Sequence, residues 1–220
     1  MADVSGSSAS QVVRMSRFPE IILLFSGKRK SGKDYITDIL FKTLDSDDIA
    51  MIKISGPIKR HWAKTRRLDF NKLLTDGEYK ENHRREMIKW GEDIRNKDPG
   101  YFCRAAIDMY NAKGKRIWIV SDVRRKTDLK WFRENFPQKC KSIRIKCPDH
   151  IRSQRGWIFT KGVDDCETEC DLDDVEGWNL TIVNAGESPE GIIELLLSLI
   201  RTELERLESD AARYGGYSLH

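Results

Sequence analysis

Apolar side chains gather in five short runs, which are separated by longer segments of mixed polarity. The runs are Ile21–Phe25, Ile49–Ser55, Arg116–Ser121, Ser142–Cys147 and Leu180–Asn184. The first run is apolar at every position, which is typical of a strand covered on both faces of a parallel sheet. Since β-branched residues are frequent in the other runs, each of the five is predicted to form a strand.

The segments between the runs have helical periodicity. Ile36, Leu40 and Leu44 recur at the spacing of one helix face, and Pro189 is placed to begin a long final helix. The apolar stripe of this last helix consists of Ile192, Ile193, Leu196, Leu199, Ile200, Leu204 and Leu207. Strands alternating with helices predict an α/β fold, a five-stranded parallel sheet flanked by helices, whose ligands bind beyond the C-terminal ends of the strands.

The 220 residues suit one domain with a single substantial core. We expect a disordered N-terminal tail over residues 1–18, a folded domain over residues 19–208 and a flexible C-terminal tail over residues 209–220. The connection of about residues 149–177 joins the fourth and fifth strands. Because it is long and charged, it is predicted to be a mobile lid.

Charge and local composition argue against several classes of protein. With 39 basic and 35 acidic residues, the net charge of +4 gives little reason to expect nucleic acid as a partner. Residues 1–20 lack the apolar core of a secretory signal, no run is long enough to cross a bilayer, and residues 217–220 do not form a peroxisomal signal. We therefore expect a cytoplasmic, cytosolic monomer that binds no membrane.

The chain has five cysteines, an odd number that favours reduced thiols over a disulfide framework. Cys147, His150, Cys166 and Cys170 have spacings that could converge on zinc. Because no paired C-x-x-C knuckles accompany them, we predict no zinc site.

The loop after the first predicted strand has the form G-x-x-x-x-G-K and leads into a predicted helix. Such a loop turns its backbone N–H groups around phosphate, and its lysine reaches the β- and γ-phosphates of a nucleotide. Asp34 stands where a hydroxyl usually ligates magnesium, and a carboxylate is also a competent ligand. The predicted ATP-binding residues are Gly27, Lys28, Arg29, Lys30, Ser31, Gly32, Lys33 and Asp34.

Charged residues also follow the other predicted strands. After the third strand, Arg124 and Arg125 can fork onto phosphate or carboxylate oxygens, and Asp122 is placed like the acid that holds magnesium in P-loop enzymes. Arg152 and Arg155 belong to the predicted lid and could close onto phosphate. The acidic residues between Asp164 and Asp174 are expected to form a solvated face or to pair with the lid arginines.

Several sequence strings closely resemble those of the animal phosphomevalonate kinases. They are F-S-G-K-R-K-S-G-K-D at 25–34, S-G-P-I-K at 55–59, W-G-E at 90–92, D-P-G-Y-F-C-R at 98–104, S-D-V-R-R at 121–125 and Q-R-G-W-I-F-T at 154–160. The resemblance runs from Ile21 to about Leu207, and that family also carries Asp after the loop lysine. It implies a nucleoside-monophosphate-kinase-like P-loop fold and magnesium-dependent transfer of phosphate from ATP to 5-phosphomevalonate, a step towards isoprenoids and sterols.

The resemblance also implies roles for individual residues. The acceptor-binding set is Lys59, Arg84, Arg95, Arg104, Arg124, Arg125 and Asn184, and Arg155 contacts ATP. From the charge that such a reaction must offset, we expect Lys30, Lys33 and Arg124 to act in catalysis and Asp34 and Asp122 to hold Mg²⁺. Ala185 departs from the family, whose members carry His after this Asn. Two other functions remain open: a nucleoside monophosphate kinase, and a nucleic-acid-binding protein using the aromatic and basic residues between the second and third strands.

Overall fold

The computed structural model describes residues 19–75 and 77–214. The predicted tail at residues 1–18 and the last part of the other tail, residues 215–220, lie outside this range. The five predicted strands are confirmed: β1 (Ile21–Gly27), β2 (Ile49–Ile52), β3 (Ile117–Val120), β4 (Cys140–Lys146) and β5 (Leu180–Val183). They form one parallel sheet in the order β2-β3-β1-β4-β5, so β1 and its loop lie at the centre.

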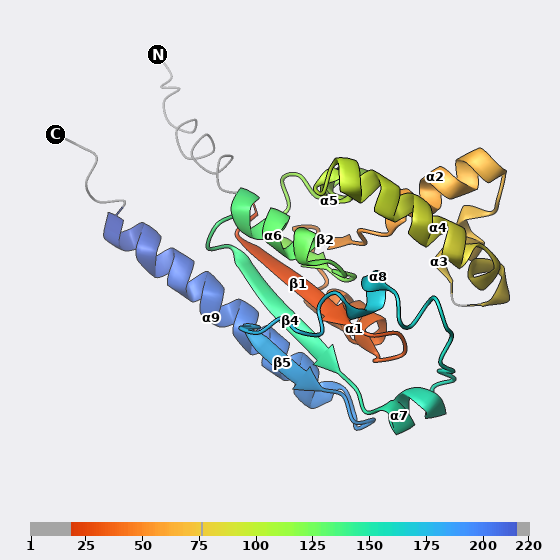
Figure 1. Ribbon diagram of the computed structural model, residues 1–220. Helices are drawn as coiled ribbons and strands as arrows, with labels where there is room; N and C mark the ends of the chain where they lie inside the picture. Colours follow the sequence, from red (N-terminus) through yellow and green to blue (C-terminus); the bar gives the residue numbers. More distant parts are fainter. Residues whose placement is uncertain (1–18, 76, 215–220) are drawn as a thin grey trace, which may run out of the picture.

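Helices cover both faces of this sheet (Figure 1). They are α1 (Lys33–Leu44), α2 (Gly56–Arg66), α3 (Phe70–Leu74), α4 (Glu78–Lys97), α5 (Tyr101–Met109), α6 (Lys126–Asn135), α7 (Asp149–Gln154), α8 (Glu167–Cys170) and α9 (Glu190–Tyr214). The predicted strand Ile49–Ser55 ends early, because the chain turns at Ser55 and Pro57 lies at the start of α2. Residues 209–214, expected to belong to a flexible tail, continue α9.

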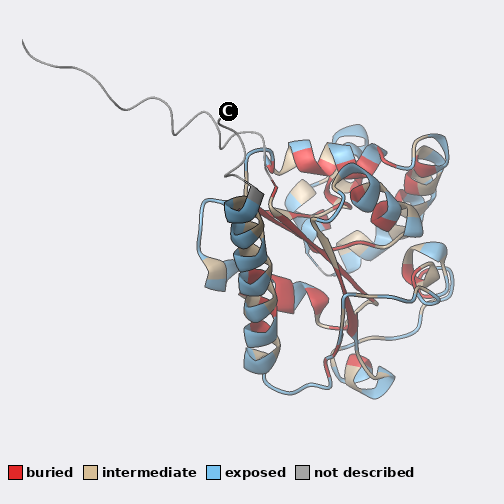
Figure 2. Ribbon diagram, turned by 90° about the vertical axis from the view of Figure 1, so that its left-hand side faces the viewer, coloured by how far each residue is buried: buried red, intermediate tan, exposed pale blue. Residues whose placement is uncertain are grey.

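The core has two layers, one on each face of the sheet. Ile22 and Leu24 of β1 contact the cluster contributed by α2, α4, α5 and α6, whereas Leu23 and Phe25 contact the cluster of α1 and α9. Figure 2 shows this distribution, with buried residues in the sheet and exposed residues on the outer side of α9. All seven residues of β1 are buried, and its run Ile21–Phe25 is apolar throughout, because β1 lies at the centre of the sheet.

Within the described residues, no helix combines the length and the apolar character that crossing a bilayer would require. The longest, α9, packs its predicted apolar stripe against α1 and β1.

The two adjacent leucines of α9 provide a test of this packing. Leu196 is fully buried, whereas Leu195 is 46% exposed. Leu196→Ala should lower the free energy of unfolding by about 2–5 kcal/mol, because it leaves a cavity between α9 and the sheet. Leu195→Ala should change it by less than about 0.5 kcal/mol. Urea unfolding measures both, and equal losses would contradict this arrangement of the helix.

Candidate active site at the phosphate loop

The phosphate loop connects the central strand β1 to α1. Its backbone is left-handed at Lys30 and Gly32, with φ values of 60° and 85°. A Cβ atom at Gly32 would lie 2.3 Å from the Asn184 side-chain nitrogen, so both the conformation and the space require glycine. The buried Lys33 ammonium donates to the Asp34 carboxylate and to the Ser121 carbonyl at the end of β3. The loop lysine therefore lies between the ends of β1 and β3.

Three side chains from the C-terminal half of the chain hold the loop from outside. Arg152 Nε donates to the Arg29 carbonyl at 2.9 Å, Arg155 Nη1 to the Lys30 carbonyl at 3.4 Å, and Asn184 Nδ2 to the Ser31 carbonyl at 2.9 Å. A loop that turns its N–H groups inward presents its carbonyl groups outward, and these need partners. Arg155, Asn184 and the phosphate loop are thus brought together, so that Asn184, predicted to bind the acceptor, contacts the phosphate loop.

The two arginines after β3 are fixed by a buried carboxylate. Asp128 Oδ2 accepts the backbone N–H groups of Arg124 at 3.2 Å and Arg125 at 3.1 Å. Burial raises the pKa of Asp128, although the nearby Arg95 opposes this effect. Arg95 is itself buried, 3.7 Å from Asp128 and over the Phe102 ring. From within the core it supports the loop after β3 that carries Arg124 and Arg125, here called the arginine loop.

Basic residues of α2 and α4 face the same region. Burial lowers the pKa of Lys59 from 10.5 to about 8, and the positive charge of Lys80 lowers it further, against the influence of Asp122. Arg84 binds Glu81 through two nitrogens, and Glu81 also lies 3.9 Å from Arg29.

Lys53 and Lys80, which the sequence analysis left out, also lie close enough to influence Lys59 electrostatically. Lys53 directly follows β2, a position that could have singled it out.

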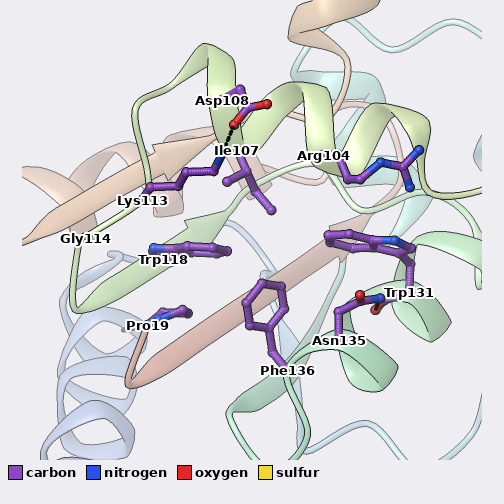
Figure 3. A pocket seen from close by; sticks show the side chains of 10 residues that line it. All are labelled: Pro19, Arg104, Ile107, Asp108, Lys113, Gly114, Trp118, Trp131, Asn135 and Phe136. Atoms are coloured by element: carbon purple, nitrogen blue, oxygen red, sulfur yellow. Dashed lines mark hydrogen bonds and ion pairs between the residues drawn. The ribbon is translucent and has the colours of Figure 1, made fainter. Parts of the chain in front are cut away.

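Arg104 lies elsewhere. Arg104, on α5, pairs with Asp98 at the end of α4 and lines a cavity of about 460 Å³ with Trp118 and Trp131 (Figure 3). Pro19, just before β1, also lines this cavity, so it opens at the N-terminal end of the strand, opposite the phosphate loop. None of the other predicted site residues contributes to it.

The two predicted magnesium ligands differ in what their oxygens contact. The Asp34 side chain is 69% exposed. Desolvation acts to raise its pKa, but the Lys33 ammonium outweighs this and lowers the pKa to about 2. An ionised, accessible carboxylate of this kind fits Mg²⁺. Asp122 accepts the backbone N–H groups of Ile54 at 2.5 Å and Ser55 at 3.1 Å, so it also holds the loop before α2.

No three His, Cys, Asp or Glu side chains in the described residues are arranged to hold a metal by themselves. Magnesium sites in phosphoryl-transfer enzymes usually combine one or two carboxylates with phosphate oxygens and water.

The acidic residues of the 149–177 segment pair with the predicted phosphate-binding residues. Lys28 pairs with Asp173 at 2.6 Å, Arg29 with Asp164 at 2.9 Å, Arg125 with Glu167 at 2.6 Å and Asp171 at 3.3 Å, and Arg124 with Glu169. The expectation of ion pairs was right, but the expected partners were wrong. Arg152, an arginine of the predicted lid, instead pairs with Asp149 and stacks on Trp157.

The pairing of Arg124 affects its acid–base properties. Burial acts to lower its pKa, but the carboxylates of Glu169, Asp122 and Asp34 outweigh this and raise it. The charge of this guanidinium is therefore permanent.

The sequence of this chain is similar to those of known proteins. The family model described as phosphomevalonate kinase matches residues 25–138. A phosphomevalonate kinase from Drosophila melanogaster is 44% identical over 185 residues, which cover 83% of this chain and 97% of that protein. The chain belongs to the phosphomevalonate kinase family. The family match includes the phosphate loop, Arg124 and Arg125, and it ends before the 149–177 segment and Asn184.

Solved structures of other kinases match this chain only weakly. A gluconokinase from Sinorhizobium meliloti 1021 has a TM-score of 0.47 and 14% identity, covering 89% of this chain and 97% of that one. A shikimate kinase from Acinetobacter baumannii in complex with shikimate has a TM-score of 0.46 and 10% identity, with coverages of 84% and 95%. These likenesses are too low to bear on the function.

Two glycines with the same backbone geometry test the fit of the phosphate loop. Gly32 and Gly114 have φ values of 85° and 84°, but a Cβ at Gly114 would meet nothing within 4 Å. Gly32→Ala should weaken the binding of a non-hydrolysable ATP analogue about tenfold or more, because the methyl group displaces Asn184 and the loop. Gly114→Ala incurs only the backbone strain, about 1–2 kcal/mol of stability. Calorimetric titration measures the binding of the analogue to both variants. Equal affinities would contradict the close approach of Asn184 to Gly32.

Proposed function

We propose that this chain transfers the γ-phosphoryl group of ATP to 5-phosphomevalonate, giving ADP and 5-diphosphomevalonate. Its family membership supports the choice of substrate. The single observation that carries the chemistry is the position of Lys33, whose ammonium contacts the end of β3 just before Arg124 and Arg125. A nucleotide site and an anion-binding arginine pair are thereby adjacent. The reaction belongs to the cytosolic route to isoprenoids and sterols.

The proposed acceptor needs no strong general base. Its nucleophile is a phosphate oxygen that is already largely ionised at neutral pH, because the second pKa of a phosphomonoester is about 6. The barrier to be overcome is repulsion between two anions. The protein's task is therefore to neutralise the two phosphates, to align them and to exclude water that would hydrolyse ATP.

Separate groups of residues serve the two substrates. Lys30 and Lys33 offset charge on the transferred group, and Arg155 contacts ATP beside the Lys30 carbonyl that it already binds. Arg124 and Arg125 hold the acceptor phosphate, and Lys59 and Arg84 bind the acceptor from α2 and α4. Magnesium, when bound, would neutralise phosphate oxygens, with Asp34 as a ligand and Asp122 nearby.

Two buried hydroxyl groups add support for an anion at this position. Within the described part of the chain, Ser31 Oγ and Ser121 Oγ are buried and have no hydrogen-bond partner. One belongs to the phosphate loop and the other to the residue whose carbonyl binds Lys33. Buried hydroxyls normally find partners, and phosphate oxygens could serve as acceptors here.

A substrate panel tests the assignment. ADP release is measured by a coupled assay with 5-phosphomevalonate, mevalonate and AMP as alternative acceptors. We expect turnover with 5-phosphomevalonate alone, because the arginine pair requires an acceptor phosphate and the family supports this one. Preference for AMP would instead assign the chain as a nucleoside monophosphate kinase.

Lys33→Met tests the role of the loop lysine. The change keeps the length of the side chain but removes its charge, so kcat should fall by about 10²- to 10³-fold while the far-ultraviolet circular dichroism stays unchanged. Lys42→Met is the control, because Lys42 is an exposed residue of the same helix. Wild-type kcat in the Lys33 variant would disprove the assignment.

The pKa of Lys59 predicts a pH dependence. Since this pKa is lowered to about 8, the cation is lost as the pH rises through 8, and an anionic acceptor is then bound less well. The kcat/KM for 5-phosphomevalonate should therefore fall above pH 8. In Lys59→Arg the fall should move to higher pH, because a guanidinium keeps its proton. An identical profile in both proteins would exclude Lys59 as its origin.

A further inference from the structure

Glu169 is a buried carboxylate to which the mechanism assigns no role. Its side chain is 3% exposed and lies in α8, within the 149–177 segment. Oε2 accepts the backbone N–H of Arg29 at 3.0 Å, and Oε1 forms an ion pair with Arg124 Nη1. One side chain thus contacts both the phosphate loop and the arginine proposed to bind the acceptor phosphate.

The neighbouring acidic residues do not make this connection. Asp164 is also buried, but it binds the Arg29 side chain, Trp157 and Thr160, none of which belongs to the loop after β3. Glu167 pairs with Arg125 and is 72% exposed. A buried carboxylate costs free energy unless it is paired, so the position of Glu169 depends on both of its contacts.

The geometry of a guanidinium explains what the contact with Glu169 can achieve. Arginine has a long side chain with several rotatable bonds, and ordering it costs conformational entropy. Its planar group carries five N–H donors, so a carboxylate can hold one part while another binds phosphate. An arginine held in advance loses less entropy when its ligand arrives.

We propose that Glu169 is a positioning residue for phosphoryl transfer. It fixes the Arg124 guanidinium relative to the phosphate loop, so that the acceptor phosphate meets the γ-phosphate in line. This inference rests on the proposed function for the identity of the reaction. It differs from a role as a stand-in for phosphate, in which Glu169 would compete with the acceptor for Arg124.

A double-mutant cycle tests this role. Glu169→Gln keeps the shape and the oxygen that accepts from Arg29, but it removes the charge that holds Arg124. We expect kcat to fall at least tenfold, with the KM for ATP changed less than twofold. In an Arg124→Lys background the same substitution should change kcat less than twofold, because the group to be positioned is already altered.

The matched control is Asp174→Asn, which removes an exposed acid from the same segment that pairs only with Lys126 among the described residues. Its kcat should stay within twofold of wild type. Additive losses in the cycle would overturn the proposal, and so would a lower KM for the acceptor in Glu169→Gln, which indicates competition.

A measurement without turnover separates this inference from the proposed function. The side-chain Nε–H signal of Arg124 is assigned by nuclear magnetic resonance from its loss in Arg124→Lys. In Glu169→Gln we expect this signal to shift and broaden as the guanidinium becomes mobile. An unchanged signal would overturn the proposal even in an active enzyme, whereas a wild-type protein inactive towards 5-phosphomevalonate would refute the function.

Discussion

Crowding of positive charge around one loop is the constraint on which this structure depends. Lys28, Arg29, Lys30 and Lys33 lie within six residues, and Arg124 and Arg125 approach from the next strand. Without anions these groups would repel one another. Carboxylates of the 149–177 segment reduce this repulsion by forming ion pairs with the basic residues, and several of them are buried or half-buried against the loop.

The sheet order makes this crowding possible. Because β1 lies between β3 and β4, the residues after β3 and the segment after β4 reach the phosphate loop from opposite sides. Buried carboxylates then fix each approach. Asp128 holds the backbone of the arginine loop, Asp122 holds the loop before α2, and Glu169 joins the arginine side to the nucleotide side. Acidic residues, which could not bind phosphate themselves, thus determine where the basic ones lie.

Local patterns were enough to predict the strands, the phosphate loop and the arginine pair, because each has its signal within a few consecutive residues. Long-range partners had no such signal. Arg95 was predicted to bind the acceptor, but it is buried against Asp128 and the Phe102 ring. Asp128 is distant in sequence, and the contact with Phe102 depends on how α4 packs against α5. The pairing of Glu169 with Arg29 spans 140 residues, and nothing in either local sequence indicates it. The early end of β2 could have been predicted from Pro57, because proline favours the first turn of a helix.

The contact between Asn184 and the Ser31 carbonyl has a consequence for biosynthesis. The two residues are 153 positions apart, and Asn184 follows the edge strand β5. When β1, α1 and β3 have been synthesised, Asn184 has therefore not yet been added to the chain, and the Ser31 carbonyl of the phosphate loop lacks its partner. Such non-local contacts form late, since the intervening chain must first be ordered. During synthesis, most of the sheet can thus form well before the phosphate loop has all of its supporting contacts.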